Sequence, residues 1–260
     1  MAVLAHFDNS LAQRLEAAEA AFGAELTEDH IWVAGGCVAS LGAGSPLTHA
    51  LGMGMNGAVT EADFERLEAF YHERNAQPNI DLCPHSDVSM LGLLGARGYS
   101  PIEFNNVMVR KITPSDRGGV LMSPTKDCEQ WALTMAKCFF AEENIPGELM
   151  IASRALFRAR SASSFLIDDL AGCGFMVQAG LATFYADGTR ELARGRGLQS
   201  ALIRGRIAIA AELGCDLATA STLPGSQSQR NYERAGFRVA YTKIAFERSS
   251  ATPTRNPSEA

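Results

Sequence analysis

The chain has 260 residues, of which 47% are hydrophobic and 20% are charged, and its formal net charge is -6. This composition is typical of a globular protein and excludes a largely disordered or fibrous one. The negative charge argues against a nucleic-acid partner, because such a surface needs concentrated positive charge. The length mildly favours two domains over one large one.

The six cysteines are scattered along the chain, without a Cys-x-x-Cys pair or neighbouring histidines. Their spacing does not fit a metal site, so we expect buried free thiols and no metal. The N-terminus lacks the basic start and long apolar run of a targeting signal, and no stretch approaches the ~18 apolar residues that span a bilayer. We therefore expect a cytoplasmic protein with no membrane partner.

The first half alternates strand and helix patterns. Phe7, Leu11 and Leu15 recur at helical spacing, and Thr60 with Asp63 forms a capping signal at the start of a second helix. The pattern predicts helices over 7–23, 59–74 and 88–98, and strands over 31–40, 47–55, 79–83 and 104–112. The residues 1–112 can therefore form one α/β domain.

A segment rich in Pro, Ser, Gly and Thr at 113–127 is typical of a linker. The second half, 128–248, reads as helices over 128–143, 149–160, 198–213 and 226–234, with strands over 165–169, 173–179, 181–189, 216–222 and 238–247. Imperfect alternation in the last strand predicts a bulge. The polar, Pro-containing tail at 249–260 is expected to be disordered.

The segment Arg194-Gly195-Arg196-Gly197-Leu198-Gln199-Ser200 lies between a predicted strand and a long helix. Its glycines let the backbone approach a ligand closely, and the first N–H groups of the helix can bind an anion. The two arginines suit a diphosphate. The alternative is a turn with a solvated basic rim.

These residues resemble the signature Gln/Arg-x-x-Gly-x-Gly/Ala of the GNAT superfamily of N-acetyltransferases. Arg194, Gly197 and Gln199 occupy its three defined positions, although Gln199 stands where Gly or Ala is expected. A strand and a helix further on, Tyr232-Glu233-Arg234-Ala235-Gly236-Phe237 resembles the family's Tyr-x-x-x-Gly-Phe. The resemblance implies an α/β (α+β) fold of two tandem GNAT-like domains, each a mixed, mostly antiparallel sheet flanked by helices.

The resemblance also implies an acetyl-CoA-dependent N-acetyltransferase, with acetyl-CoA or another acyl-CoA as co-substrate and the amine attacking directly. By this resemblance Tyr232 is the candidate general acid, and Asp187 or Glu191 the candidate base. A packing tyrosine and two solvated carboxylates are the alternatives. The implied cofactor contacts are Gly188, Thr189, Arg194, Gly195, Arg196, Gly197, Leu198, Gln199, Ser200 and Ser228.

Other features limit the resemblance. Gly225 replaces the family's Asn seven residues before the tyrosine, so Ser226 or Ser228 would have to supply that hydrogen bond. The thioester carbonyl would be polarised by a backbone N–H near Thr189. The turn Asn56-Gly57-Ala58-Val59 carries no basic residue, which makes the first half resemble a degenerate copy that cannot hold pyrophosphate.

The resemblance implies an amine on a small molecule or peptide as acceptor, and the sequence does not identify it. His49, His72 and His85 are candidates for one wall of its site, although lone histidines are more often packing or surface residues. A monomer or a homodimer is expected. A non-catalytic acyl-CoA sensor or partner-binding module is the alternative function, and a purely structural protein is a third.

Overall fold

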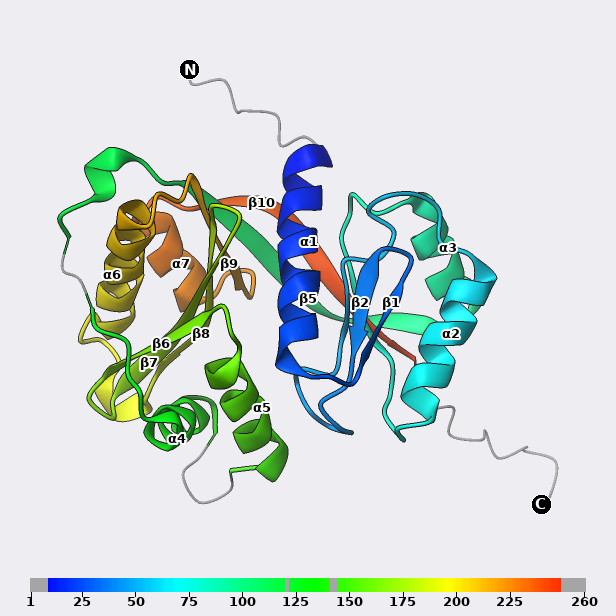
Figure 1. Ribbon diagram of the computed structural model, residues 1–260, viewed down its shortest axis with the longest axis horizontal. Helices are drawn as coiled ribbons and strands as arrows, with labels where there is room; N and C mark the ends of the chain where they lie inside the picture. Colours follow the sequence, from blue (N-terminus) through cyan, green and yellow to red (C-terminus); the bar gives the residue numbers. More distant parts are fainter. Residues whose placement is uncertain (1–8, 120–121, 141–144, 249–260) are drawn as a thin grey trace, which may run out of the picture.

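The computed structural model describes residues 9–119, 122–140 and 145–248, and ten strands of this part form a single sheet (Figure 1). Their order is β1-β2-β3-β4-β10-β5-β9-β8-β7-β6. Only β3–β4 and β8–β9 are parallel pairs; the other neighbours are antiparallel. The expected class, a mixed and mostly antiparallel sheet flanked by helices, is therefore confirmed.

The strands are β1 (His30–Val33), β2 (Gly36–Ala39), β3 (Ala50–Leu51), β4 (Asn79–Leu82), β5 (Tyr99–Lys111), β6 (Ala162–Ile167), β7 (Ala171–Gln178), β8 (Leu181–Thr189), β9 (Leu217–Thr222) and β10 (Arg238–Arg248). The helices are α1 (Asn9–Leu26), α2 (Glu61–His72), α3 (Val88–Ala96), α4 (Cys128–Phe139), α5 (Gly147–Arg158), α6 (Leu198–Glu212) and α7 (Gln227–Arg234). Two short 3-10 turns are η1 (Pro114–Asp116) and η2 (Glu191–Ala193). In Figure 1, α1 runs over the middle of the molecule, with α2 and α3 in one half and α4 to α7 in the other.

The two halves repeat one pairing pattern. In β1-β2-β3-β4 and in β6-β7-β8-β9, two antiparallel pairs are followed by a parallel pair, which a helix connects. The closing strands β5 and β10 pair with each other at the centre of the sheet. Each also pairs with a strand of the opposite half, β5 with β9 and β10 with β4. The sheet thus runs across the domain boundaries expected from the sequence, 1–112, 113–127 and 128–248. These boundaries stay a prediction.

Apolar side chains fill both faces of the sheet. Beneath α6 and α7, Phe184 packs on Tyr232 and Phe237. On the opposite face, Leu15 of α1 belongs to a cluster with Val107 and Tyr241. The helix α1 therefore closes the junction where β5 and β10 meet.

Two strand predictions were wrong. The expected strand over 31–40 is a hairpin of β1 and β2, because Ala34 and Gly35 have φ of 47° and 80° and turn the chain back. The strand expected over 47–55 shrinks to β3, because Gly52 and Gly54 adopt φ near 71° and 72°. The bulge expected in the last strand is confirmed by the register shift between Val239 and Tyr241 of β10. The predicted tail, 249–260, and the first residues of the first helix lie outside the described residues.

All six cysteines are free, and all except the half-buried Cys128 are buried. Within the described part of the chain, no group of three or more His, Cys, Asp or Glu could hold a metal ion. None of the helices described here is long and apolar enough to cross a membrane.

Candidate functional site

The parallel strands β8 and β9 part before β8 ends. They are paired from Leu181 and Leu217 to Phe184 and Ala220, whereas β8 continues to Thr189 along β7. At the parting β8 carries a bulge, where the register shift sets two residues, Ala186 and Asp187, against a single residue of β7. Ala186 has φ of 50°. Past this point the two strands no longer pair with each other, so their backbone groups border a gap.

Beyond β8 the chain makes the glycine turn and enters α6. Gly197 is the N-cap residue with φ of 76°, and no side chain caps this helix end by a hydrogen bond. Gly195 has φ of 77°, and a Cβ added at either glycine would meet nothing within 4 Å. Arg194 and Arg196 are exposed, and the first turn holds no acidic residue. Open N–H groups, open space and positive charge fit a diphosphate group.

The next two residues anchor this turn. Leu198 packs against the core under α6. Gln199 Nε2 donates to Ser228 Oγ at 2.9 Å, and Asn231 Nδ2 donates to Gln199 Oε1 at 2.6 Å. The larger side chain at position 199 therefore ties α6 to α7. Ser200 is half-buried in the first turn of α6.

Tyr232 is fully buried and belongs to a charged network. Its hydroxyl donates a hydrogen bond to Asp187 Oδ2, and the buried Arg206 of α6 donates to Asp187 Oδ1. Arg206 also donates to the carbonyl of Gly174 at 2.9 Å, and its guanidinium lies over the ring of Phe184. The network connects α6, α7 and the bulge of β8.

Burial fixes the protonation of this network. Loss of water raises the pKa of Tyr232 well above its usual value, although the charge of Arg206 opposes the shift. For Arg206, burial lowers the pKa, but the neighbouring groups, Asp187 foremost, together raise it by more. At neutral pH Tyr232 thus keeps its proton and Arg206 its charge.

The remaining candidates are placed differently. Glu191 is exposed at the start of η2. Gly188 is buried, and a Cβ there would lie 2.6 Å from the Cβ of Cys138, so α4 requires a glycine at this position. Thr189 pairs with Ala171 of β7. The sequence therefore located these positions near the turn, but they do not converge on one point with Tyr232.

A cavity of ≈ 560 Å³ opens at the parted strands, on the α1 side of the sheet. Ala186 and Ser221 line it where β8 and β9 separate, and Phe22 of α1 lines it from above. Its walls come from both halves of the chain and include Glu19, His49 and Asp81. Neither Tyr232 nor Asp187 lines it. A cavity of this size suits a small-molecule ligand.

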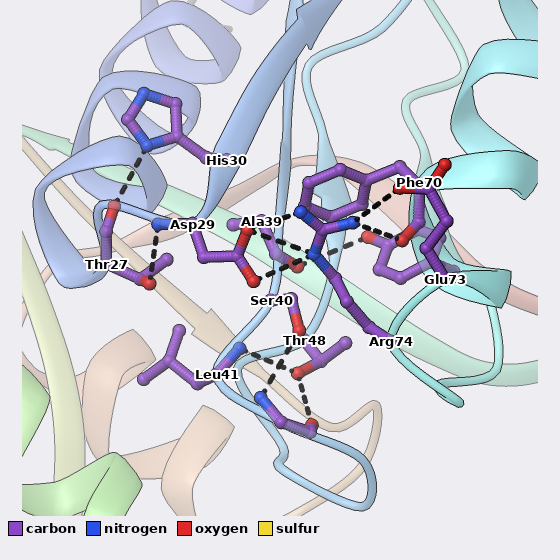
Figure 2. A network of polar contacts seen from close by, with 12 residues as sticks. Thr27, Asp29, His30, Ala39, Ser40, Leu41, Thr48, Phe70, Glu73 and Arg74 are labelled. Carbon is purple, nitrogen blue, oxygen red and sulfur yellow. Dashed lines mark hydrogen bonds and ion pairs between the residues drawn. The ribbon is translucent and has the colours of Figure 1, made fainter.

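Polar contacts hold the part of the cavity wall that comes from the N-terminal half of the chain (Figure 2). Thr48 Oγ1 donates to the carbonyl of Gly42 at 2.8 Å and accepts from the N–H of Leu41, which closes the loop that carries His49. Arg74 binds both carboxylate oxygens of Asp29 and joins α2 to the approach of β1. These bonds give the loop a defined position beside α1.

Of the three candidate histidines, His49 lines this cavity. His85 packs edge-on against Tyr241, which also lines it, with ring centroids 5.7 Å apart. His72 lines a separate cavity of ≈ 440 Å³ between α2 and the end of β10, away from the parted strands.

Sequence reasoning missed Arg206 and the acidic part of the cavity. Arg206 shares a helical stripe with Leu202 and Ala210, which are all buried. A charged residue on an apolar stripe signals a buried pair and was available in the sequence. Glu19 of α1 and Asp81 of β4 come together only through the packing of α1 on the sheet, so no local pattern indicates them.

Against protein-family models and curated proteins the sequence gives no match. Among solved structures, a GCN5-related N-acetyltransferase from Kribbella flavida is similar with a TM-score of 0.66 at 15% identity, covering 92% of this chain and 96% of its own. One from Sphaerobacter thermophilus has a TM-score of 0.52 at 17% identity over 72% of this chain and 66% of its own. A tandem GNAT protein from the clavulanic acid biosynthesis pathway has a TM-score of 0.52 at 13% identity, over 72% and 68%. The chain therefore has the GNAT fold.

Proposed function

We propose that the protein is an N-acyltransferase that moves an acetyl group, or a related acyl group, from acyl-CoA directly to an amine. One observation carries the proposal: the parted strands β8 and β9 lie next to a helix that begins with an uncapped glycine turn. The turn offers a place for a diphosphate, and the parting offers a place for the arm that carries the thioester. The GNAT fold supports the same arrangement.

In this proposal the turn binds the diphosphate of acetyl-CoA. Gly195 and Gly197 leave space for it, while Arg194 and Arg196 supply positive charge. The first N–H groups of α6, from Leu198 to Ser200, would donate to its oxygens. Ser228 accepts from Gln199 and holds that turn against α7. Gly188 and Thr189 lead the chain from β8 toward the turn.

Acetyl-CoA would supply the reactive thioester, and the protein would orient and polarise it. We assign the polarising N–H to the bulge at Ala186 and Asp187, because Thr189 lies beyond the parting and pairs with β7. Asp187 or Glu191 would take the proton that the ammonium must lose. The N–C bond then forms and the C–S bond breaks. Tyr232 is the proposed proton donor to sulfur, for which its hydroxyl would have to turn from Asp187 to the sulfur.

We also propose that the first half is a degenerate copy without a CoA site. Its equivalent helix, α2, is capped by its own residues: Thr60 Oγ1 accepts from the N–H of Asp63, and Asp63 accepts from the N–H of Thr60. Glu61 adds a second carboxylate in the first turn. Negative charge and satisfied N–H groups both oppose a diphosphate.

A matched pair of glycine variants tests the cofactor site. Gly197→Glu places a carboxylate and a strained left-handed residue at the start of α6. Gly214→Glu does the same beyond the end of α6, since Gly214 has φ of 73° and open space around a Cβ. We expect acetyl-CoA binding to weaken at least about a hundredfold in Gly197→Glu alone. If both variants bound acetyl-CoA equally well, the glycine turn would not be part of the cofactor site.

The alternative is a protein that binds acyl-CoA without transferring the acyl group. Its support is the complete burial of Tyr232, which does not line the cavity, and the glycine at position 225. Release of CoA thiol over a panel of amines separates the two functions. Saturable acetyl-CoA binding with no amine-dependent thiol release would favour the alternative.

A further inference from the structure

The cavity at the parted strands has an apolar middle and one acidic end. Near the parting its wall includes Phe22, and Leu15 and Val107 line its middle. At the other end Glu19, Asp81 and His49 reach the surface of the cavity. This distribution separates two places where a polar group of a ligand could lie.

The acidic end presents the carboxylates of Glu19 and Asp81 and the imidazole of His49 to the cavity. The ammonium of Lys243 is buried behind it, bonded to Glu19 and 3.2 Å from the buried Glu16, and neither Lys243 nor Glu16 lines the cavity. The Glu19 side chain is 40% exposed, and among the described residues nothing donates to its Oε1. Glu19 thus lines the cavity with one carboxylate oxygen that accepts from no donor among the described residues.

The second carboxylate, Asp81, has a lowered pKa. Burial raises the pKa of Asp81, but a hydrogen bond from His49 and the charges of Lys243 and His49 together lower it by more. The Nδ1 of His49 lies 3.6 Å from Asp81 Oδ1. A cationic group at this end would thus lie beside the carboxylates of Asp81 and Glu19.

The spacing of the strands sets the distance between the two ends of the cavity, the parted strands and the acidic end. Lys243 is on β10 and Ser221 on β9, with β5 between them. Two interstrand spacings amount to about 10 Å. The backbone of Lys243, whose ammonium binds Glu19, therefore lies on the order of 10 Å from Ser221 at the parting.

From this geometry we infer that the acceptor is a diamine, or an amine with a second cationic group on the order of 10 Å away along an apolar chain. One nitrogen lies at the parted strands and is acylated. The other is held by Glu19 and Asp81. The inference rests on the proposed function for the reacting end, whereas the binding of the second cation does not depend on acyl transfer.

Kinetics with three acceptors of equal length test this inference: octamethylenediamine, octylamine and ω-aminooctanoate. With acetyl-CoA as donor, we expect kcat/KM for the diamine to exceed that for octylamine about tenfold, because only the diamine places an ammonium at the acidic end. The amino acid should be poorest, because its carboxylate meets Glu19 and Asp81. Octylamine equal to or better than the diamine would overturn the inference.

Matched variants assign the preference to residues. Glu19→Gln and Asp81→Asn remove one charge each and keep the shape, and Glu28→Gln removes an exposed charge just beyond α1. We expect the preference to fall to about threefold or less in the first two variants and to persist in Glu28→Gln. If the preference for the diamine persisted in both Glu19→Gln and Asp81→Asn, these two residues would not be its cause.

Calorimetric binding of octamethylenediamine without acetyl-CoA separates this inference from the proposed function. We expect Glu19→Gln to bind the diamine about tenfold more weakly than Glu28→Gln. If that difference is found but no amine causes thiol release, the acyltransferase proposal fails and the cation site stands. If octylamine and the diamine are acetylated equally, the cation site fails and the acyltransferase stands.

Discussion

The hydroxyl of Tyr232 on α7 donates a hydrogen bond to the carboxylate of Asp187 at the bulge of β8. Arg206 of α6 binds the other oxygen of that carboxylate. The proposed proton donor, the proposed carbonyl-binding strand and the helix that begins at the glycine turn are therefore connected through one carboxylate. A change at any of the three residues acts on the other two.

Tyr232→Phe separates proton donation from packing. The ring remains in place against Phe184 and Phe237, while the hydrogen bond to Asp187 is lost. We expect kcat to fall about a hundredfold with the KM for acetyl-CoA little changed, as for loss of a general acid. Steady-state kinetics give both numbers. Unchanged kcat would exclude Tyr232 from the mechanism.

Arg206→Met leaves Asp187 as a buried carboxylate without its charged partner. Such a loss costs about 3 to 5 kcal/mol of unfolding free energy. Urea denaturation measures this loss in Arg206→Met and in the double variant that also carries Asp187→Asn. The double variant should recover part of the loss, because no unpaired charge remains. Equal losses in the two variants would show that the ion pair is not the cause.

Much of the candidate site follows local rules, and the sequence was sufficient there. The glycine turn before α6, the Thr60 cap of α2 and the bulge of β10 all depend on neighbours within a few residues. The pairing of β5 with β9 and β10 with β4 does not, because strands separated by more than a hundred residues carry no mutual signal. The cavity walls depend on that pairing. His49 was a candidate because histidine is a common functional residue, whereas nothing in the sequence set Glu19 and Asp81 apart from other carboxylates.

Thiol reactivity follows burial. Loss of water raises the pKa of Cys37 and Cys138 to about 11 and of Cys83 and Cys173 to about 12, and it also raises the pKa of Cys215. Thiolates are the reactive form, so these five should be inert at neutral pH. We expect a disulfide reagent to modify only Cys128 rapidly in the folded protein and all six thiols in urea. Rapid reaction of a second thiol before unfolding would contradict the packing described.

Alkaline pH should destabilise the fold through the tyrosines. Burial raises the pKa of all five, Tyr71, Tyr99, Tyr185, Tyr232 and Tyr241. Because the folded state holds these protons more tightly than the unfolded chain, their contribution to stability is complete below about pH 10 and decreases as the pH rises above it. Urea midpoints should therefore fall as the pH rises above about 10. Tyrosinate absorbance that develops near pH 10 without unfolding would contradict the burial.

The most direct measurement is calorimetric titration of the protein with acetyl-CoA. The uncapped turn of α6 and the capped, acidic start of α2 predict saturable binding at one site per chain. Absence of binding would contradict the acyltransferase proposal. Binding at two sites would instead contradict the claim that the first half has lost its CoA site.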